Sequence, residues 1–283
     1  MTDTRPTDSP RSILITGCSS GIGRHAALGL KARGWRVFAG VRSRNDLASL
    51  AEEGVEPVHL DYDSPAIVAT ALYRVLDLTN GRLDALFNNG AYSQLGAVED
   101  IATEHLRAQF EANFFGWHEL IRKVVPVMRR QGGGRIVNCS SILGFVAARY
   151  RGAYVASKYA LEGMTDALRL ELAGTGIHVV LIEPGPIRSR FIENALACFN
   201  ETVDSDRSVH RDAYAKVLAR LNRGNASSRF KRSPEAVFKK LVHALEADNP
   251  RARYRVTAPT HVAAWMKRLL PTGLIDRIVL SQH

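Results

Sequence analysis

The chain has 283 residues and a formal net charge of +10, from 38 Lys and Arg against 28 Asp and Glu. This length is sufficient for one α/β domain with a large core, because such folds of roughly 200 to 250 residues often form a single unit. No uninterrupted apolar run reaches membrane-spanning length, and the three cysteines, Cys18, Cys139 and Cys198, lack the spacing of a metal site or a redox pair. We therefore expect a cytoplasmic protein with reduced thiols and no metal site.

The positive charge is concentrated towards the C-terminal end, where residues 201–283 contain 16 Lys and Arg but 8 Asp and Glu. A basic face can bind nucleic acid, an anionic membrane or a phosphorylated ligand, although a solvated face is the commoner explanation. Because no zinc-ligand spacing, RNA-binding aromatic motif or internal repeat accompanies this charge, we expect no nucleic-acid partner.

The opening segment "MTDTRPTDSP" is polar and contains proline, which predicts a disordered leader over residues 1–10 and not a signal peptide. From residue 11 onwards, short apolar runs rich in β-branched residues alternate with helical patterns. The expected strands are "SILIT", "WRVFAGV", "VEPVHL", "LDALFN", "GRIVNCS", "IHVVLIEP" and "ARYRVT". The expected helices cover residues 22–33, 64–79, 103–130, 153–173 and 234–246. This alternation predicts an α/β protein with a doubly wound parallel sheet of about seven strands, the Rossmann fold, over residues 11–259.

A glycine-rich segment, "TGCSSGIG", joins the first expected strand to the first expected helix. Gly17, Gly21 and Gly23 allow a tight turn and a close approach of the backbone to a pyrophosphate, whose charge the helix N-terminus favours. Because the segment lies between a strand and a helix, we interpret it as a dinucleotide-binding turn and not only as a tight turn.

The segment "RGAYVASKYA" places Tyr154 and Lys158 four residues apart, and therefore on one face of a helix. A nearby ammonium lowers the pKa of a phenol, which is ordinarily about 10. The pair is therefore a candidate acid and base, and a chance pair on an amphipathic helix is the alternative.

Taken together, these segments resemble the short-chain dehydrogenase/reductase family. The resemblance rests on "TGCSSGIG", on "NNGA" from Asn88 to Ala91, on Asn113 in "EANFFG", on "NCSS" and on "YVASK". It runs from about Arg11 to Arg190 and continues more loosely to the end of the chain. The segments "NFFG", "ASKYALEG" and "LIEPGPIRSRF" are most similar to a bacterial branch of NADP-dependent aldehyde reductases, which is related to hydroxysteroid and retinol dehydrogenases.

The resemblance implies a catalytic role for four residues. Tyr154 would protonate a carbonyl oxygen as hydride arrives, or accept the proton in the reverse direction. Lys158 would lower the pKa of Tyr154 and hold the nicotinamide ribose, and Ser141 would donate a hydrogen bond to the substrate oxygen. Ser140 competes with Ser141, but strand side chains alternate and the family's spacing favours Ser141. Asn113 would hold a water that links Lys158 to solvent, and a buried asparagine that caps a backbone group is the alternative.

The resemblance also implies a set of cofactor-binding residues: Thr16, Gly17, Ser19, Ser20, Gly21, Ile22, Gly23, Arg42, Asp61, Asn89, Tyr154, Lys158, Pro184, Gly185 and Ile187. NAD-specific members of the family end the second strand with an acid, whereas this chain has Val41 there, followed by Arg42. A guanidinium suits a ribose 2′-phosphate, so we expect NADP(H). Ser43 and Arg44 could also contribute to binding of the 2′-phosphate, although the Arg44 side chain could instead extend into solvent. Asp61 could contact the adenine or cap a turn, and we weigh these readings equally.

One segment departs from the family pattern, because Asn88-Asn89-Gly90-Ala91 stands where the family has Asn-Asn-Ala-Gly. Ala91 brings a methyl group to a position where the family has none. If the backbone there requires a positive φ angle, the exchange costs stability or shifts the cofactor.

The remaining segments predict a lid and a helical extension. Residues 186–232 lack a strand pattern, and the family places a substrate lid there. The segment "THVAAWMKRLLPTGLIDRIVL" predicts two amphipathic helices within residues 260–283. We expect their apolar face to pack on the protein's own core or lid, and a partner subunit or an anionic membrane surface is the alternative. The resemblance also implies a homo-oligomer, either a dimer or a tetramer.

The sequence therefore predicts an NADPH-dependent enzyme that reduces an apolar aldehyde or ketone. A steroid or retinoid alcohol dehydrogenase that works by oxidation is one alternative. A non-catalytic NADP-binding sensor or interaction protein is another, but sensors tend to lose the tyrosine or the lysine and this chain keeps both. The substrate itself is not determined by the sequence.

Overall fold

The computed structural model describes residues 10–227 and 230–281. The predicted leader over residues 1–10 lies, apart from Pro10, outside the described residues. A single sheet of seven strands runs through the molecule in the order β3-β2-β1-β4-β5-β6-β7, and all neighbouring strands are parallel. The strands are β1 (Ser12–Thr16), β2 (Arg36–Val41), β3 (Glu56–His59), β4 (Ala85–Asn88), β5 (Gly134–Cys139), β6 (Ile177–Glu183) and β7 (Arg253–Arg255). The predicted doubly wound sheet is confirmed.

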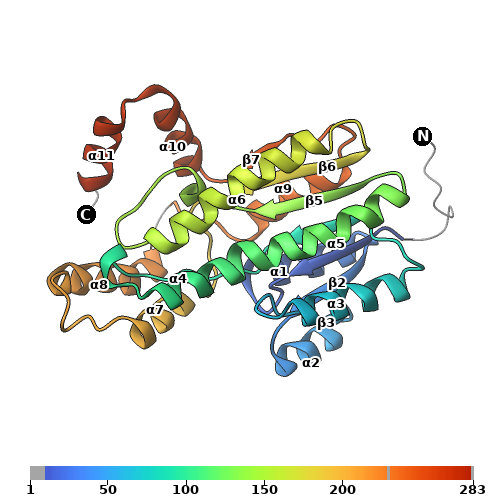
Figure 1. Ribbon diagram of the computed structural model, residues 1–283, viewed down its shortest axis with the longest axis horizontal. Helices are drawn as coiled ribbons and strands as arrows, with labels where there is room; N and C mark the ends of the chain where they lie inside the picture. The colour runs from blue at the N-terminus through green and yellow to red at the C-terminus, as the bar shows by residue number, and fades with distance from the viewer. Residues whose placement is uncertain (1–9, 228–229, 282–283) are drawn as a thin grey trace.

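Helices cover both faces of this sheet (Figure 1). Helix α1 packs against α9 on one face, and α3 packs against α5 on the other, next to α6. The helices around the sheet are α1 (Gly21–Ala32), α2 (Arg44–Glu52), α3 (Pro65–Leu78), α4 (Thr103–Phe110), α5 (Gly116–Arg130), α6 (Gly152–Glu171) and α9 (Glu235–Glu246). Because both faces are covered, every residue of β1 and β4 is buried.

Two helical features differ from the prediction. Helix α2 was not expected, because its nine residues show a weak apolar pattern; Ser43 caps it by accepting a hydrogen bond from the amide of Asn45 (3.2 Å). The expected helix over residues 103–130 is confirmed in its bounds, but it contains an unexpected π-helical turn, Glu111–Phe115, between α4 and α5. Such a turn adds one residue to the helix without disturbing the general apolar pattern, so periodicity did not reveal it.

The segment expected to form a lid contains α7 (Phe191–Thr202) and α8 (Arg211–Ser227). These helices share a second, smaller core with the loop after β4 and with Tyr150, which precedes α6: Leu95, Ala97, Tyr150, Ala195, Phe199, Val203 and Tyr214. The hydroxyl of Tyr214 donates to Asp100 and accepts from the amide of Ala97 (2.7 Å). The segment is therefore helical and packed, although it carries no strand pattern.

The two predicted C-terminal helices are present as α10 (Ala258–Leu269) and α11 (Thr272–Ser281). The expectation that their apolar face packs on this chain's core or lid is wrong, because Val262, Trp265 and Leu269 are exposed. Thr260 is the one buried residue of α10, and no residue of α11 is buried. Amphipathic spacing shows which side of a helix is apolar but not what covers that side.

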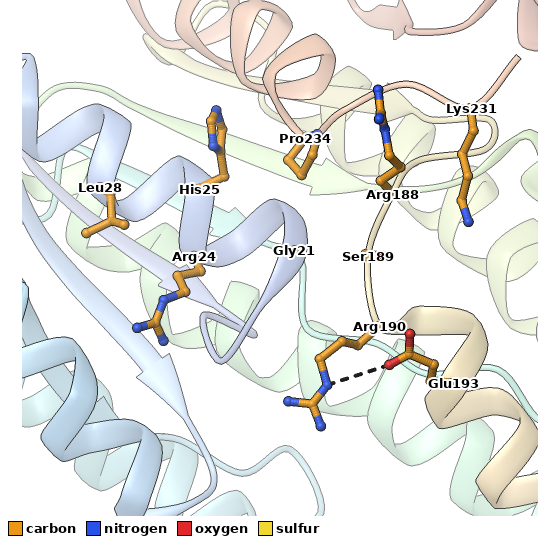
Figure 2. Close-up of a pocket in the computed structure, with 10 residues that line it drawn as sticks. All are labelled: Gly21, Arg24, His25, Leu28, Arg188, Ser189, Arg190, Glu193, Lys231 and Pro234. Atoms are coloured by element: carbon orange, nitrogen blue, oxygen red, sulfur yellow. Dashed lines mark ion pairs between the residues drawn. The ribbon is translucent and has the colours of Figure 1, made fainter. Parts of the chain in front are cut away.

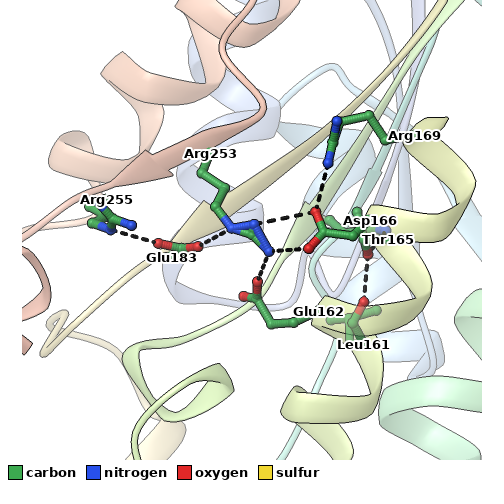
Figure 3. Close-up of polar contacts among 9 residues, drawn as sticks. Leu161, Glu162, Thr165, Asp166, Arg169, Glu183, Arg253 and Arg255 are labelled. Atoms are coloured by element: carbon green, nitrogen blue, oxygen red, sulfur yellow. Dashed lines mark hydrogen bonds and ion pairs between the residues drawn. The ribbon is translucent and has the colours of Figure 1, made fainter. Parts of the chain in front are cut away.

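A network of charged side chains joins α6, β6 and β7 (Figure 3). Arg253 pairs with Glu162 (3.0 Å), Asp166 (2.6 Å) and Glu183 (3.1 Å), and Arg255 adds a second pair to Glu183 (3.3 Å). Glu183 is almost completely buried at the end of β6. Burial raises the pKa of Glu162 to about 7, and the nearby charges of Glu183 and Asp166 act in the same direction, whereas Ser140 and Arg253 oppose them. Arg253 thus compensates three carboxylates at once.

We predict that Arg253→Ala lowers the free energy of unfolding by about 3 kcal/mol, because it leaves buried carboxylates without their cation. Arg122→Ala is the control: Arg122 pairs with Glu119 at the surface (3.0 Å), and its loss should cost less than about 1 kcal/mol. Urea unfolding of both variants measures the two effects. Equal losses would show that the buried network contributes no more than a surface pair.

A second prediction concerns pH. Because the pKa of Glu162 in the folded protein is about 7, above its ordinary value of 4.5, folding retains a proton that the unfolded chain releases. The stability that this group contributes is complete below pH 4.5 and is lost as pH rises through 7. Glu162→Gln should therefore become more stable relative to wild type between pH 5 and pH 8, roughly the range in which the folded glutamate titrates. Glu171→Gln, at the exposed end of α6, controls for the change in net charge, and parallel stability curves for all three proteins would contradict the prediction.

Candidate active site

Four predicted catalytic residues meet beyond the carboxyl ends of β4 and β5. Tyr154 and Lys158 lie on α6 and are 6% and 1% exposed. Ser141 is the second residue after β5, and its polar side chain lowers the pKa of Tyr154 against the effect of burial. Asn113, in the π-helical turn, donates to Ser157 of α6 (3.3 Å). The fold therefore brings together side chains that lie up to 45 residues apart in the chain.

The environment of Tyr154 is apolar apart from a few polar contacts. The ring of Phe191, at the start of α7, meets the Tyr154 ring edge-on with 5.5 Å between centroids. Burial raises the pKa of Tyr154, and the hydrogen bond with Ser141 and the charge of Arg151 oppose this effect. The expectation of a lowered pKa is therefore not met in this structure, because removal of water disfavours the phenolate more than these neighbours favour it. At neutral pH the side chain is a neutral phenol and can donate a proton.

Lys158 is held by a backbone carbonyl and by an aromatic ring. Its Nζ donates to the carbonyl oxygen of Cys139 (2.8 Å) and lies 4.3 Å from the centroid of the Trp117 ring, against 5.8 Å from that of Tyr154. Burial lowers the pKa of Lys158 to about 8. The sequence analysis did not single out Trp117, although it follows Asn113 by four residues and therefore shares its helix face.

The structure separates the two serines that compete for the catalytic role. Ser141 acts on Tyr154, whose pKa it lowers, and its Oγ accepts from the amide of Leu143 (3.1 Å). Ser140 instead lies near Glu162, whose pKa it lowers. This arrangement agrees with the alternation of side chains along a strand.

Asn113 caps a backbone segment. Its Oδ1 accepts from the amide of Tyr92 (3.2 Å), and its Nδ2 donates to the carbonyl of Tyr92 (2.9 Å) as well as to Ser157. These bonds tie the π-helical turn to the loop after β4 and to α6. The contacts are those of the backbone-capping alternative, and the water-holding role remains a prediction.

The glycine-rich turn leaves no room for side chains. Gly17 and Gly21 have φ angles of +69° and +58°, which favour glycine. A Cβ atom on Gly17 would lie 2.5 Å from the Cα of Gly90, and one on Gly23 would overlap the carbonyl oxygen of Gly17. Ser20 precedes α1 without capping it through its side chain, so the first amides of α1 can receive an anion. The cradle therefore fits the pyrophosphate of a dinucleotide.

Two predicted cofactor residues, Thr16 and Asn89, hold this cradle in place. The Oγ1 of Thr16 accepts from the amides of Asn89 (2.9 Å) and Gly90 (3.0 Å), and the Nδ2 of Asn89 donates to the carbonyl of Thr16 (3.0 Å). Gly90 is therefore the residue that approaches Gly17. Ala91 is not among the described residues with a positive φ angle, so the exchange in "NNGA" causes no backbone strain.

Arg42 and Asp61 lie where the adenosine end of a dinucleotide is expected. Arg42 is exposed directly after β2, and its charge counteracts the raised pKa of Asp63, which arises from burial and from the charge of Asp61. The Oδ1 of Asp61 accepts from the amide of Asp63 (3.2 Å). This is the turn cap that the sequence analysis weighed, and an adenine contact by Asp61 remains a prediction. Ser43 acts as the cap of α2.

The loop after β6 is fixed from two sides. The carbonyl of Pro184 accepts from the amide of Ile142 (2.8 Å), and Gly185 lies so close to Thr257 that a Cβ atom on it would overlap the threonine Oγ1. Ile187 pairs with Arg232 in a short parallel bridge. Among the other predicted cofactor residues, Ser19 is exposed and Ile22 is half-buried.

A cleft of about 570 Å³ opens between α1 and this loop (Figure 2). It is lined by Gly21, Arg24, His25, Leu28, Arg188, Ser189, Arg190, Glu193, Lys231 and Pro234. A Cβ atom on Gly21 would lie 2.9 Å from the Cβ of Ser189, which therefore covers the glycine-rich turn. The sequence analysis missed Ser189, although it lies only two residues after Ile187. The basic lining adds to the fit of this region for a phosphate-bearing cofactor.

Comparisons with known proteins agree with this geometry. The sequence model of the family described as short chain dehydrogenase matches residues 11–197. The chain is 43% identical over 269 residues to the uncharacterized oxidoreductase YbbO of Escherichia coli K12, covering 95% of this chain and 94% of that protein. It is 32% identical over 263 residues to human 17-beta-hydroxysteroid dehydrogenase type 1, covering 87% and 77%. A short chain dehydrogenase from Burkholderia cenocepacia J2315, solved in complex with NADP, has a TM-score of 0.74 and 26% identity, with coverage of 95% and 97%.

The family match covers well over half of the chain, and the relatives align along most of its length. Strands β1 to β6 and the group formed by Ser141, Tyr154 and Lys158 lie within the residues that the family model matches. The protein is therefore an oxidoreductase of the short chain dehydrogenase family.

Proposed function

We propose that the protein is an NADPH-dependent reductase that converts an apolar aldehyde or ketone into the alcohol. The observation that carries this proposal is the buried Tyr154, a neutral phenol that lies on the same helix face as Lys158 and whose pKa is raised by burial, an effect that Ser141 opposes. A neutral phenol in an apolar site is suited to donate a proton to a carbonyl oxygen.

In this proposal, each group has a separate role in the reaction. NADPH, when bound, supplies the hydride that adds to the carbonyl carbon. Tyr154 donates its phenolic proton to the carbonyl oxygen, which gives the alcohol, and the phenolate then regains a proton from solvent. Ser141 donates a hydrogen bond to the same oxygen as negative charge develops on it. Lys158 favours the transient phenolate through its charge and would bind the nicotinamide ribose.

The choice of NADPH over NADH rests on the end of β2. Val41 ends this strand where an acid would repel a 2′-phosphate, and the exposed Arg42 follows it. The Burkholderia relative was solved with NADP, which supports the same choice. In this proposal Arg42 binds the 2′-phosphate, and the glycine-rich turn and the start of α1 bind the pyrophosphate.

The preference for an apolar substrate rests on the surroundings of Tyr154. The Phe191 ring contacts the tyrosine, and residues 186–232, with their own apolar core, would act as a substrate lid. The human relative is a steroid dehydrogenase by name. Oxidation of a steroid or retinoid alcohol by the same residues is therefore the second candidate. Assembly as a dimer or a tetramer also remains a proposal.

We predict that Arg42→Ala weakens NADPH binding about 10- to 100-fold, because one charge-assisted phosphate contact contributes roughly 1.5 to 3 kcal/mol. NADH binding should change little. Arg130→Ala, which removes an exposed guanidinium at the end of α5, is the control and should leave both dissociation constants close to wild type. Tighter binding of NADH than of NADPH by the wild-type protein would contradict the assignment.

We predict that Tyr154→Phe nearly abolishes turnover and leaves NADPH binding close to normal, because only the proton donor is lost. Lys158→Ala should impair both turnover and binding. Tyr159→Phe removes a hydroxyl from the same helix, where the side chain is partly exposed, and should retain activity. Steady-state turnover and cofactor titration measure these effects, and full activity of Tyr154→Phe would assign the tyrosine a structural role.

The proposed function is tested by following NADPH and NADH consumption over a panel of aldehydes, ketones, and steroid and retinoid carbonyls. We expect NADPH-dependent reduction of apolar members of the panel. Activity confined to the oxidation of steroid or retinoid alcohols would favour the second candidate. Tight NADPH binding without turnover of any compound would favour a sensor.

A further inference from the structure

The C-terminal helices α10 and α11 present apolar side chains to solvent. Among the described residues, 14 large apolar side chains are exposed, and five of these lie on the two helices: Val262, Trp265, Leu269, Leu274 and Leu280. Helix α10 turns Thr260 and the small side chains of Ala263 and Ala264 towards the rest of the protein, and these are buried or half-buried. Its Val262, Trp265 and Leu269 are exposed and point away from the protein, whereas Met266 is half-buried. This arrangement is the reverse of an ordinary surface helix.

Basic residues accompany this apolar face. Lys267 and Arg268 are exposed in the last turn of α10, and Arg277 is exposed on α11, whereas Asp276 is the one acidic residue between 258 and 281. Apolar residues with an exposed tryptophan, flanked by lysine and arginine, characterise helices that lie in the interface of an anionic membrane. Among the described residues, no helix is long and apolar enough to span a bilayer. The pair is therefore suited to lie on a membrane.

A second copy of this chain is a less suitable occupant. A two-fold interface brings the same surface of each protomer together. Contact between two copies of this face would bring two sets of Lys267, Arg268 and Arg277 into one interface, with Asp276 as the one acidic residue of each set, and like charges repel. An anionic lipid surface instead pairs each of these cations with a phosphate.

We propose that α10 and α11 form a docking surface for anionic lipid bilayers. The surface consists of Val262, Trp265, Leu269, Leu274 and Leu280 as the inserted apolar side chains, and of Lys267, Arg268 and Arg277 as contacts to lipid phosphates. The docked protein is peripheral, because the helices lie in the lipid interface without crossing it. This inference does not depend on the proposed function.

The docking surface is connected to the cofactor site. Thr257, which precedes α10, and Thr260, on its first turn, share a hydrogen bond (3.0 Å) and both contact Gly185 in the loop after β6. Figure 1 shows α10 and α11 projecting beyond the sheet at the end where β6 leads into the lid segment. Docking through these helices therefore holds the active-site end of the sheet near the lipid, from which apolar molecules can reach it.

Tryptophan fluorescence tests the proposal on the full chain. The three tryptophans differ in exposure: Trp35 and Trp117 are 5% and 0% exposed, and Trp265 is 63% exposed. Titration with vesicles of phosphatidylglycerol and phosphatidylcholine should shift the emission to shorter wavelengths, because Trp265 leaves water. Trp265→Phe should remove this shift and still bind vesicles. Vesicles of phosphatidylcholine alone should cause little shift at low salt.

Co-flotation with the same vesicles tests which residues bind the lipid. Trp265→Glu combined with Leu269→Glu should abolish flotation, and Lys267→Glu combined with Arg268→Glu should weaken binding at least about tenfold. Leu170→Glu is the matched control, because Leu170 is 66% exposed on α6, and it should float like wild type. All variants should keep the circular dichroism and the NADPH affinity of wild type, which separates lost docking from misfolding and from failure of the proposed function.

Three results would overturn the proposal. The first is no flotation of the wild-type protein with anionic vesicles at low salt. The second is equal binding to neutral vesicles, which would exclude a role for the basic residues. The third is a shift of the tryptophan emission in the absence of lipid that increases with protein concentration, accompanied by an increase in molar mass. Both changes would be absent from the variant that combines Trp265→Glu with Leu269→Glu. That result would assign the surface to a second copy of the chain.

Discussion

The candidate site depends on the contact between two backbone turns. The turn after β1 and the turn after β4 meet at Gly17 and Gly90 with no space for a side chain between them. Hydrogen bonds from Asn89 and Gly90 to Thr16 maintain this contact. The same loop after β4 is tied through Tyr92 to Asn113, and the carbonyl of Gly90 accepts from Trp117, whose ring lies next to the Lys158 ammonium. The proposed dinucleotide cradle and the proposed catalytic pair are thereby fixed to one another.

Burial determines the protonation states at this site. It raises the pKa of Tyr154 and lowers that of Lys158, so the phenol is neutral and the ammonium holds its proton less firmly than in water. A site prepared in this way contains a proton donor in the absence of cofactor. Glu162 lies one turn after Lys158 on α6, and Arg253 of β7 forms ion pairs with it and with Glu183 of β6. The polar groups near the site are thus compensated on one side, while the side that faces Phe191 remains apolar.

The apolar residues of the C-terminal third lie in two separate cores and on one exposed surface. Helix α9 contributes Val237 and Leu241 to the main core under the sheet. Helices α7 and α8 enclose a smaller core that supports the lid segment. Helices α10 and α11 expose their apolar residues. Basic residues are frequent throughout this part of the chain. On α10 and α11 they accompany five exposed large apolar side chains, which is why the same composition has a different consequence there.

By itself, the sequence determined the alternation of strands and helices, the glycine-rich turn and the common helix face of Tyr154 and Lys158. These are properties of neighbouring residues, because backbone periodicity and the conformational freedom of glycine act over a few positions. The tertiary structure alone decided the pKa of Tyr154, the π-helical turn at Asn113, the carboxylates that Arg253 compensates and the exposure of Trp265. Each of these depends on which distant segments remove water from a group, and the spacing of residues along one helix or strand contains no information about that.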